Sequence, residues 1–188
     1  DHRVLFTPDD AAGGFAFGPD GERLAFTRDT DAGTEVWLMA ADGTDRRRVA
    51  GPDRFGALVW SPDGSALAHV ASERVGAYAG VPGTVTVADH LGWRHLRQGE
   101  REGELRQLHV VDLATGENRP LPTPDLDVRE VAWSPTGDQL VICAKRVRDL
   151  GRTLDTDLFV LDRDGGRLRQ LTRNPGPDQH PRWFAPDR

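Results

Sequence analysis

The stretch Leu58-Val59-Trp60-Ser61-Pro62-Asp63-Gly64 decides the fold of this chain, because variants of it recur along the sequence. The other copies are Phe15-Ala16-Phe17-Gly18-Pro19-Asp20-Gly21, Val131-Ala132-Trp133-Ser134-Pro135-Thr136-Gly137 and the irregular Pro181-Arg182-Trp183-Phe184-Ala185-Pro186-Asp187. Their equivalent aromatic residues are 43, 73 and 50 residues apart. Such a repeat is typical of a fold that stacks copies of one supersecondary unit.

Each complete copy predicts a tight turn followed by a strand. The proline presets φ at the first corner, the Asp or Thr accepts a local hydrogen bond, and the glycine permits a positive φ. An apolar-rich run follows each turn, as in Ala66-Leu67-Ala68-His69-Val70. Each turn is therefore expected to close a β-hairpin.

A second hairpin follows in every unit. In the second unit, Leu108-His109-Val110-Val111-Asp112 is followed by the turn Ala114-Thr115-Gly116-Glu117, and the same order occurs at 36–49 and 158–166. Gly-containing turns between apolar runs are strong hairpin signals. Two hairpins per unit, at a period of roughly 40–45 residues, predict an all-β fold: a β-propeller of four-stranded antiparallel blades.

The chain is expected to be a partial propeller over residues 1–188. The predicted blades cover about 13–50, 57–122 with an insertion at 72–106, and 129–172, while 3–7 and 181–184 are expected to be strands of adjoining blades. Propellers normally close with about four to eight blades. The chain is thus expected either to belong to a longer propeller or to pair its open edges with another copy. Because unpaired edges favour association, we expect this segment alone to dimerise or aggregate.

Composition argues against several classes of partner. The formal net charge is −6 without a basic stripe, so no nucleic-acid partner is expected. No run approaches the roughly 20 apolar residues of a membrane span, so no membrane partner is expected. Cys143 is the single cysteine, which excludes an internal disulfide or a Cys-based metal cluster. The loop at 29–35 is too short for a calcium site, and only His90 and His95 hint at metal spacing. We expect no metal and no cofactor.

The repeats resemble a known group of proteins. The turn copies, the hairpin LHVVDLATGE at 108–117 and the segment RLRQLT at 167–172 resemble the WD-like propeller repeats of the prolyl oligopeptidase family of serine peptidases and of the periplasmic Tol-system propeller. The opening FTPDD at 6–10 and a surplus of about 30 residues in the second unit resemble the acylaminoacyl-peptidase and dipeptidyl-peptidase-like branch.

The resemblance implies a non-catalytic role for this chain. In such enzymes the propeller caps a hydrolase domain of the same polypeptide, excludes large folded substrates and helps to bind the peptide. The expected partners are therefore the protein's own C-terminal hydrolase domain and a peptide, and the expected location is cytoplasmic. The sequence has no Gly-x-Ser-x-Gly nucleophile elbow, so no catalytic residue is assigned. The alternative is a Tol-type protein-binding scaffold without peptidase activity, which would be periplasmic or secreted.

The insertion is the candidate site, because long loops on a rigid scaffold often carry binding or gating. Three glutamates there alternate, so in an extended segment they would share one face and suit a peptide's amino terminus. Two arginines would suit a carboxylate or carbonyl. The candidate residues are Trp93, Arg94, Arg97, Glu100, Glu102 and Glu104. The other interpretation of this segment is a solvated charged loop.

Overall fold

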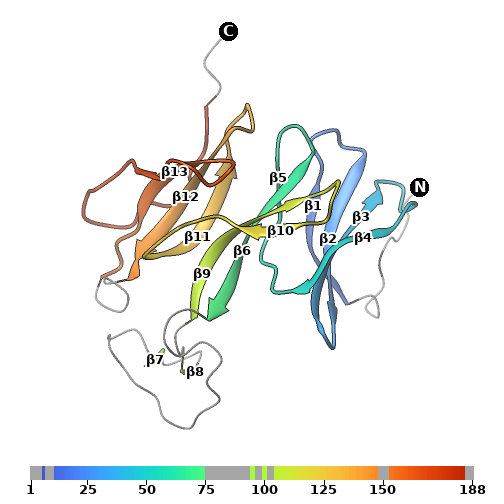
Figure 1. The fold of residues 1–188 in the computed structure, drawn as a ribbon, viewed down its shortest axis with the longest axis horizontal. Helices are drawn as coiled ribbons and strands as arrows, with labels where there is room; N and C mark the ends of the chain where they lie inside the picture. Colours follow the sequence, from blue (N-terminus) through green and yellow to red (C-terminus); the bar gives the residue numbers. More distant parts are fainter. Residues whose placement is uncertain are drawn as a thin grey trace.

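The computed structural model describes residues 6, 11–74, 94–95, 99–100, 104–147 and 153–184, and it confirms the all-β prediction. Three four-stranded antiparallel sheets stand side by side in an arc, as Figure 1 shows. The described residues contain no α-helix, and none of their elements is a helix that could span a membrane.

Each sheet is one blade, built from strands in nearly sequential order. Blade 1 contains β1 (Ala12–Phe17), β2 (Arg23–Thr30), β3 (Gly33–Ala40) and β4 (Arg47–Asp53). Blade 2 contains β5 (Val59–Trp60), β6 (Ala66–Arg74), β9 (Glu104–Asp112) and β10 (Asn118–Pro120). Blade 3 contains β11 (Leu126–Trp133), β12 (Gln139–Arg146), β13 (Asp157–Asp162) and β14 (Arg169–Gln170). The short strands β7 (Arg94–His95) and β8 (Gly99–Glu100) pair only with each other.

The two expected flanking strands have different outcomes. Residues 3–7 lie, apart from Phe6, outside the described residues. Residues 181–184 form no strand in the described part of the chain, so their assignment to an adjoining blade stays a prediction. No fourth four-stranded sheet occurs among the described residues, so this segment has no neighbouring strand there with which to pair.

The repeated turns form through their small polar side chains. In blade 2 the Ser61 hydroxyl donates to Asp63 Oδ1 at 2.6 Å, while Ser61 Oγ accepts from the Ala66 amide at 2.9 Å. Gly64 follows at φ +66°, a conformation that residues with a Cβ rarely adopt. In blade 3 the acceptor is Asp138, to which Ser134 Oγ donates at 2.8 Å. The two turns therefore have the same shape, although the carboxylate that accepts the serine hydroxyl stands at a different position of the turn in blade 3 than in blade 2.

The period of two along each strand divides the apolar side chains between two interfaces. We call the interface between blades 1 and 2 seam 1–2, and that between blades 2 and 3 seam 2–3. On β6, Leu67 belongs to the core cluster of seam 1–2, whereas Ala66 and Ala68 belong to that of seam 2–3. Blade 2 is thus buried on both faces, which explains its nearly continuous apolar strands.

The repeated tryptophans link neighbouring blades. Trp60 Nε1 donates to the Ala16 carbonyl of blade 1 at 2.8 Å, and Trp133 Nε1 donates to the Val59 carbonyl of blade 2 at 3.0 Å. Trp183 donates to the Ala132 carbonyl at 3.3 Å, although it lies in no strand. Each indole therefore reaches the first strand of the preceding blade.

Candidate functional site

The predicted site residues lie largely beyond what the structure describes. Trp93, Arg97 and Glu102 are outside the described residues. Arg94 and Glu100 are opposite each other in the β7–β8 ladder, and Glu104 begins β9 opposite Arg74. The structure describes their backbone but not their side chains, so their role in binding stays a prediction.

The insertion leaves blade 2 at one defined end of the sheet. The β6–β9 ladder runs from the pair Ala66–Asp112, next to the repeated turn, to the pair Arg74–Glu104. The chain therefore leaves β6 and re-enters β9 at the end opposite the repeated turns, and Figure 1 shows β7 and β8 beyond that end. We call it the insertion end. In blade 1 the same connection needs only two residues between Thr30 and Gly33.

A buried carboxylate of blade 3 binds Arg106, the last residue of the predicted insertion, which we call the root of the insertion. Asp127 of β11 accepts hydrogen bonds from the Arg106 amide and Nε, both at 3.0 Å, and from Arg106 Nη2 at 2.7 Å. The Asp127 side chain is only 5% exposed, and Arg129 lies 3.8 Å away. The hydrogen bonds to Asp127 raise the pKa of Arg106. A bidentate Arg–carboxylate pair of this kind fixes the orientation of the two side chains as well as the distance between them.

Uncharged side chains next to the Arg106–Asp127 pair add further hydrogen bonds between blades 2 and 3. Gln107 Nε2 donates to the Leu126 carbonyl at 3.1 Å, and the Thr123 hydroxyl donates to Gln107 Oε1 at 2.9 Å. Sequence reasoning missed this set because it treated 72–106 as a loop up to its last residue. A carboxylate within the otherwise apolar start of a strand, Leu126-Asp127-Val128, is the signal that could have identified it.

A second polar cluster extends from two buried histidines in seam 1–2 to the exposed Asp53. His69 Nε2 lies 3.0 Å from Asn118 Oδ1, and Asn118 Nδ2 donates to Asp53 Oδ2 at 3.0 Å. The ring of His109, opposite His69 in the β6–β9 ladder, stacks 5.1 Å away, and Phe55 covers His69 at 4.6 Å. Burial lowers the pKa of His69 to about 4, against a smaller upward effect of the Asn118 hydrogen bond.

Sequence reasoning considered these histidines only for metal spacing. Residues 69 and 109 are 40 positions apart, so only the strand register reveals that they face each other. Within the described ranges no group of three or more His, Cys, Asp or Glu side chains could hold a metal ion.

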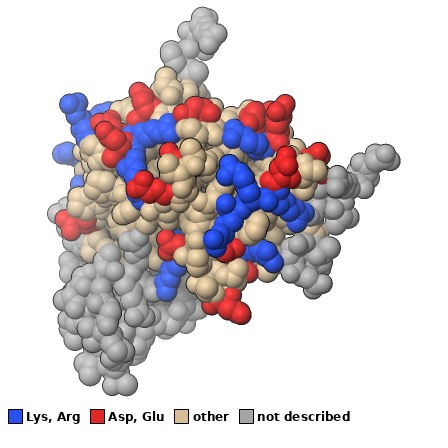
Figure 2. Space-filling model, turned by 45° about the vertical axis from the view of Figure 1, so that its right-hand side comes forward, with Lys and Arg blue, Asp and Glu red and all other residues tan. Residues whose placement is uncertain are grey.

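At the end of the sheets that carries the repeated turns, charged side chains on the surface link blade 2 to blade 3. Arg163 donates to Asp63 Oδ2 at 2.9 Å and to Ser65 Oγ at 2.6 Å, and its guanidinium lies 5.4 Å from the Trp133 ring centre. The Ser61 hydroxyl, followed by the Ser65 and Arg163 donors, keeps the pKa of Asp63 well below its usual range. Figure 2 shows positive and negative side chains interspersed over the face that it presents.

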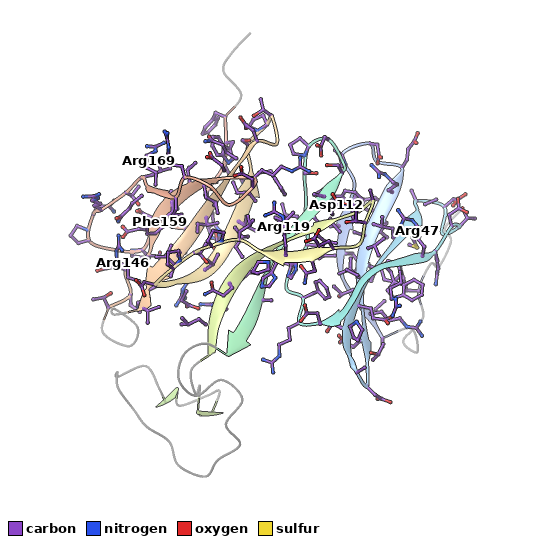
Figure 3. The ribbon with its side chains drawn as sticks, viewed as in Figure 1. Arg47, Asp112, Arg119, Arg146, Phe159 and Arg169 are labelled. Carbon is purple, nitrogen blue, oxygen red and sulfur yellow. The ribbon has the colours of Figure 1, made fainter. Side chains whose placement is uncertain are left out.

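The outer strand of blade 2 also reaches blade 3. Arg119 of β10 donates to the Arg163 carbonyl at 2.8 Å and to the Asp164 carbonyl at 3.2 Å, and Figure 3 labels it on that strand. Together with the Arg106–Asp127 pair, these bonds connect blade 2 to blade 3 at both ends of the sheet.

The sequence relatives of this chain are peptidases. No family model matches the sequence. The chain is 30% identical to a probable dipeptidyl peptidase 4 of Aspergillus fumigatus, over 85% of this chain and 24% of that protein. It is 25% identical to the uncharacterized peptidase YuxL of Bacillus subtilis, over 76% of this chain and 23% of that one. The chain is homologous to these peptidases.

Solved structures agree on the fold. The acylaminoacyl peptidase of Pyrococcus horikoshii matches with a TM-score of 0.67 and 18% identity, over 87% of this chain and 25% of the enzyme. TolB of Acinetobacter baumannii matches with a TM-score of 0.57 and 18% identity, over 90% of this chain and 34% of that protein. The resemblance to the propeller portion of prolyl oligopeptidase-family peptidases is thereby confirmed. The chain spans about a quarter of the curated relatives that it matches.

Proposed function

We propose that this chain is the non-catalytic propeller portion of a prolyl oligopeptidase-family serine peptidase, in which it caps the hydrolase domain and controls access of peptides. The observation that carries the proposal is homology to peptidases across 85% of the chain but only 24% of the relative. The partners would be the protein's own hydrolase domain and a peptide substrate, in the cytoplasm.

The insertion is the part of the chain best suited to control access. It interrupts one blade of three, and the Arg106–Asp127 pair orients its root against blade 3. A segment held in this way at one end of a rigid blade would narrow the path to a chamber at that end. The arginines and glutamates of residues 94–104 would then contact the peptide.

The peptidase assignment is tested on the native polypeptide that contains this sequence. We expect a fluorophosphonate probe, which reacts with activated serines, to label a chain several times longer than 188 residues, and heat-denatured protein to remain unlabelled. A native chain that ends after further blades and does not react would contradict the proposal. It would instead support the Tol-type scaffold with a protein partner.

The access role is tested separately in that full-length protein. Replacing residues 75–103 with Asn-Gly joins Arg74 to Glu104, which already face each other in the ladder. We expect kcat/KM for long polypeptides to rise relative to that for dipeptide substrates. As a control of unchanged length, the Glu100→Gln, Glu102→Gln, Glu104→Gln variant should raise KM only for peptides with a free amino terminus. Unchanged size selectivity after the deletion would refute gating and leave the peptidase assignment intact.

A further inference from the structure

The polar half of seam 1–2 contains a histidine pair without an obvious structural need. His69 is completely buried and His109 is 5% exposed. They form the next pair on the same face of the β6–β9 ladder after Leu67 and Val111, farther from the repeated turns. Apolar side chains would fill this position more simply, as Ala68 and Val110 do on the opposite face of the same sheet.

The hydrogen bonds around His69 determine its tautomer. Because Asn118 uses its amide nitrogen to donate to Asp53, its oxygen is the group that faces His69. His69 therefore donates through Nε2, and its Nδ1 is the unprotonated nitrogen. That Nδ1 is buried and has no hydrogen-bond partner within the described ranges.

Protonation of His69 would place a new N–H in this closed space. Among the described residues, two titratable groups act on it electrostatically: His109 of β9, which disfavours the charge, and Asp53 of β4, which favours it. Asp53 acts from behind Asn118, whereas the His109 ring stacks directly on His69. The charged ring would therefore be stabilised mainly by moving blade 1 away and admitting water.

We propose that seam 1–2 is an acid-sensitive interface: protonation of His69, against the stacked ring of His109, loosens blade 1 from blade 2 while blades 2 and 3 stay packed. The interface would respond to acidification of the surroundings. The proposal concerns this chain's own packing, so it stands whether or not a peptidase domain is attached.

Each seam contains its own reporter for the test. The Trp60 indole N–H is bonded across seam 1–2 and the Trp133 indole N–H across seam 2–3. Their hydrogen exchange is measured by NMR from pH 7 to pH 5 and corrected for the intrinsic pH dependence of exchange. With a His69 pKa of about 4 in the closed state and an ordinary one in the open state, opening at Trp60 should rise roughly 20-fold. Exchange at Trp133 should stay constant.

Two variants complete the test. His69→Gln, which can still donate to Asn118, should remove most of the pH dependence at Trp60. His180→Gln, at a side chain that is 76% exposed on blade 3, should leave it unchanged. The proposal is overturned if both indoles lose protection together or if His69→Gln keeps the full pH dependence. If His69→Gln does not fold, the His69 ring is titrated in the wild-type protein, and an ordinary pKa with an unchanged seam overturns the proposal.

Discussion

The two seams differ in the kind of side chain that they bury between neighbouring blades. Seam 2–3 is lined by a large apolar cluster that includes Leu108, Leu140, Ile142 and Leu161, all completely buried, and an ion pair closes it at the insertion end. Seam 1–2 is apolar near the repeated turns but continues into the His69, Asn118 and Asp53 cluster.

The difference teaches that similar blades need not be joined with equal strength. Apolar burial contributes at any pH, whereas a buried neutral histidine contributes only while it stays neutral. Blades 2 and 3 are therefore expected to behave as one stable unit, with blade 1 joined to it through the more sensitive seam.

The largest expected effect comes from opening a cavity in seam 2–3. Leu161→Ala should lower the free energy of unfolding by about 3–4 kcal/mol, because Leu161 is completely buried and the space cannot fully collapse. Urea denaturation measures the change. Leu154→Ala, at a side chain that is 85% exposed, is the control and should shift stability by less than about 0.5 kcal/mol. Equal losses in the two variants would show that seam 2–3 is not the stable interface.

The next effect comes from breaking the ion pair at the insertion root. Asp127→Ala should cost about 2–3 kcal/mol, because it leaves Arg106 partly buried without its carboxylate. The control is Arg48→Ala, which removes the 53% exposed partner of Glu35 within blade 1 and should cost less than about 1 kcal/mol. Limited proteolysis in the insertion should accelerate only in Asp127→Ala. Similar urea midpoints for both variants would contradict this order.

A pH-dependent loss follows from seam 1–2. The pKa of His69 is about 4 in the folded chain against 6.5 for an unperturbed histidine, so the unfolded chain binds more protons between these values. Stability therefore falls as pH drops through this window, by roughly 2 kcal/mol between pH 7 and pH 5. Urea midpoints of wild type and His69→Gln across this range measure the contribution. Parallel curves for the two proteins would remove His69 from the explanation.

The smallest effect tests the indole links. Trp133→Phe should cost about 1 kcal/mol, since the Val59 carbonyl loses its donor while the aromatic wedge remains. Trp37→Phe is the control, because its indole bonds to the Glu35 carboxylate within blade 1 and crosses no seam. Thermal unfolding measures both variants. A larger loss for Trp37→Phe would mean that the links between blades carry little energy.

Local chemistry determined most of the fold. The turn copies place a proline, a small polar residue and a glycine at fixed positions, and the following apolar runs alternate with the period of a strand. These signals depend on neighbours within a few residues, so the sequence was sufficient to predict the four-stranded blades. The flanking segment at 181–184 shows the limit, because a strand forms only beside a partner.

The tertiary structure decided what lies between the blades. His69 faces His109, and Arg106 meets Asp127, only after strand register and blade packing have brought distant segments together. The sequence by itself determined the repeating unit and its resemblance to peptidase propellers. Which polar residues are buried, and which seam depends on protonation, followed from the burial of specific pairs, since desolvation acts only on groups that the folded chain removes from water.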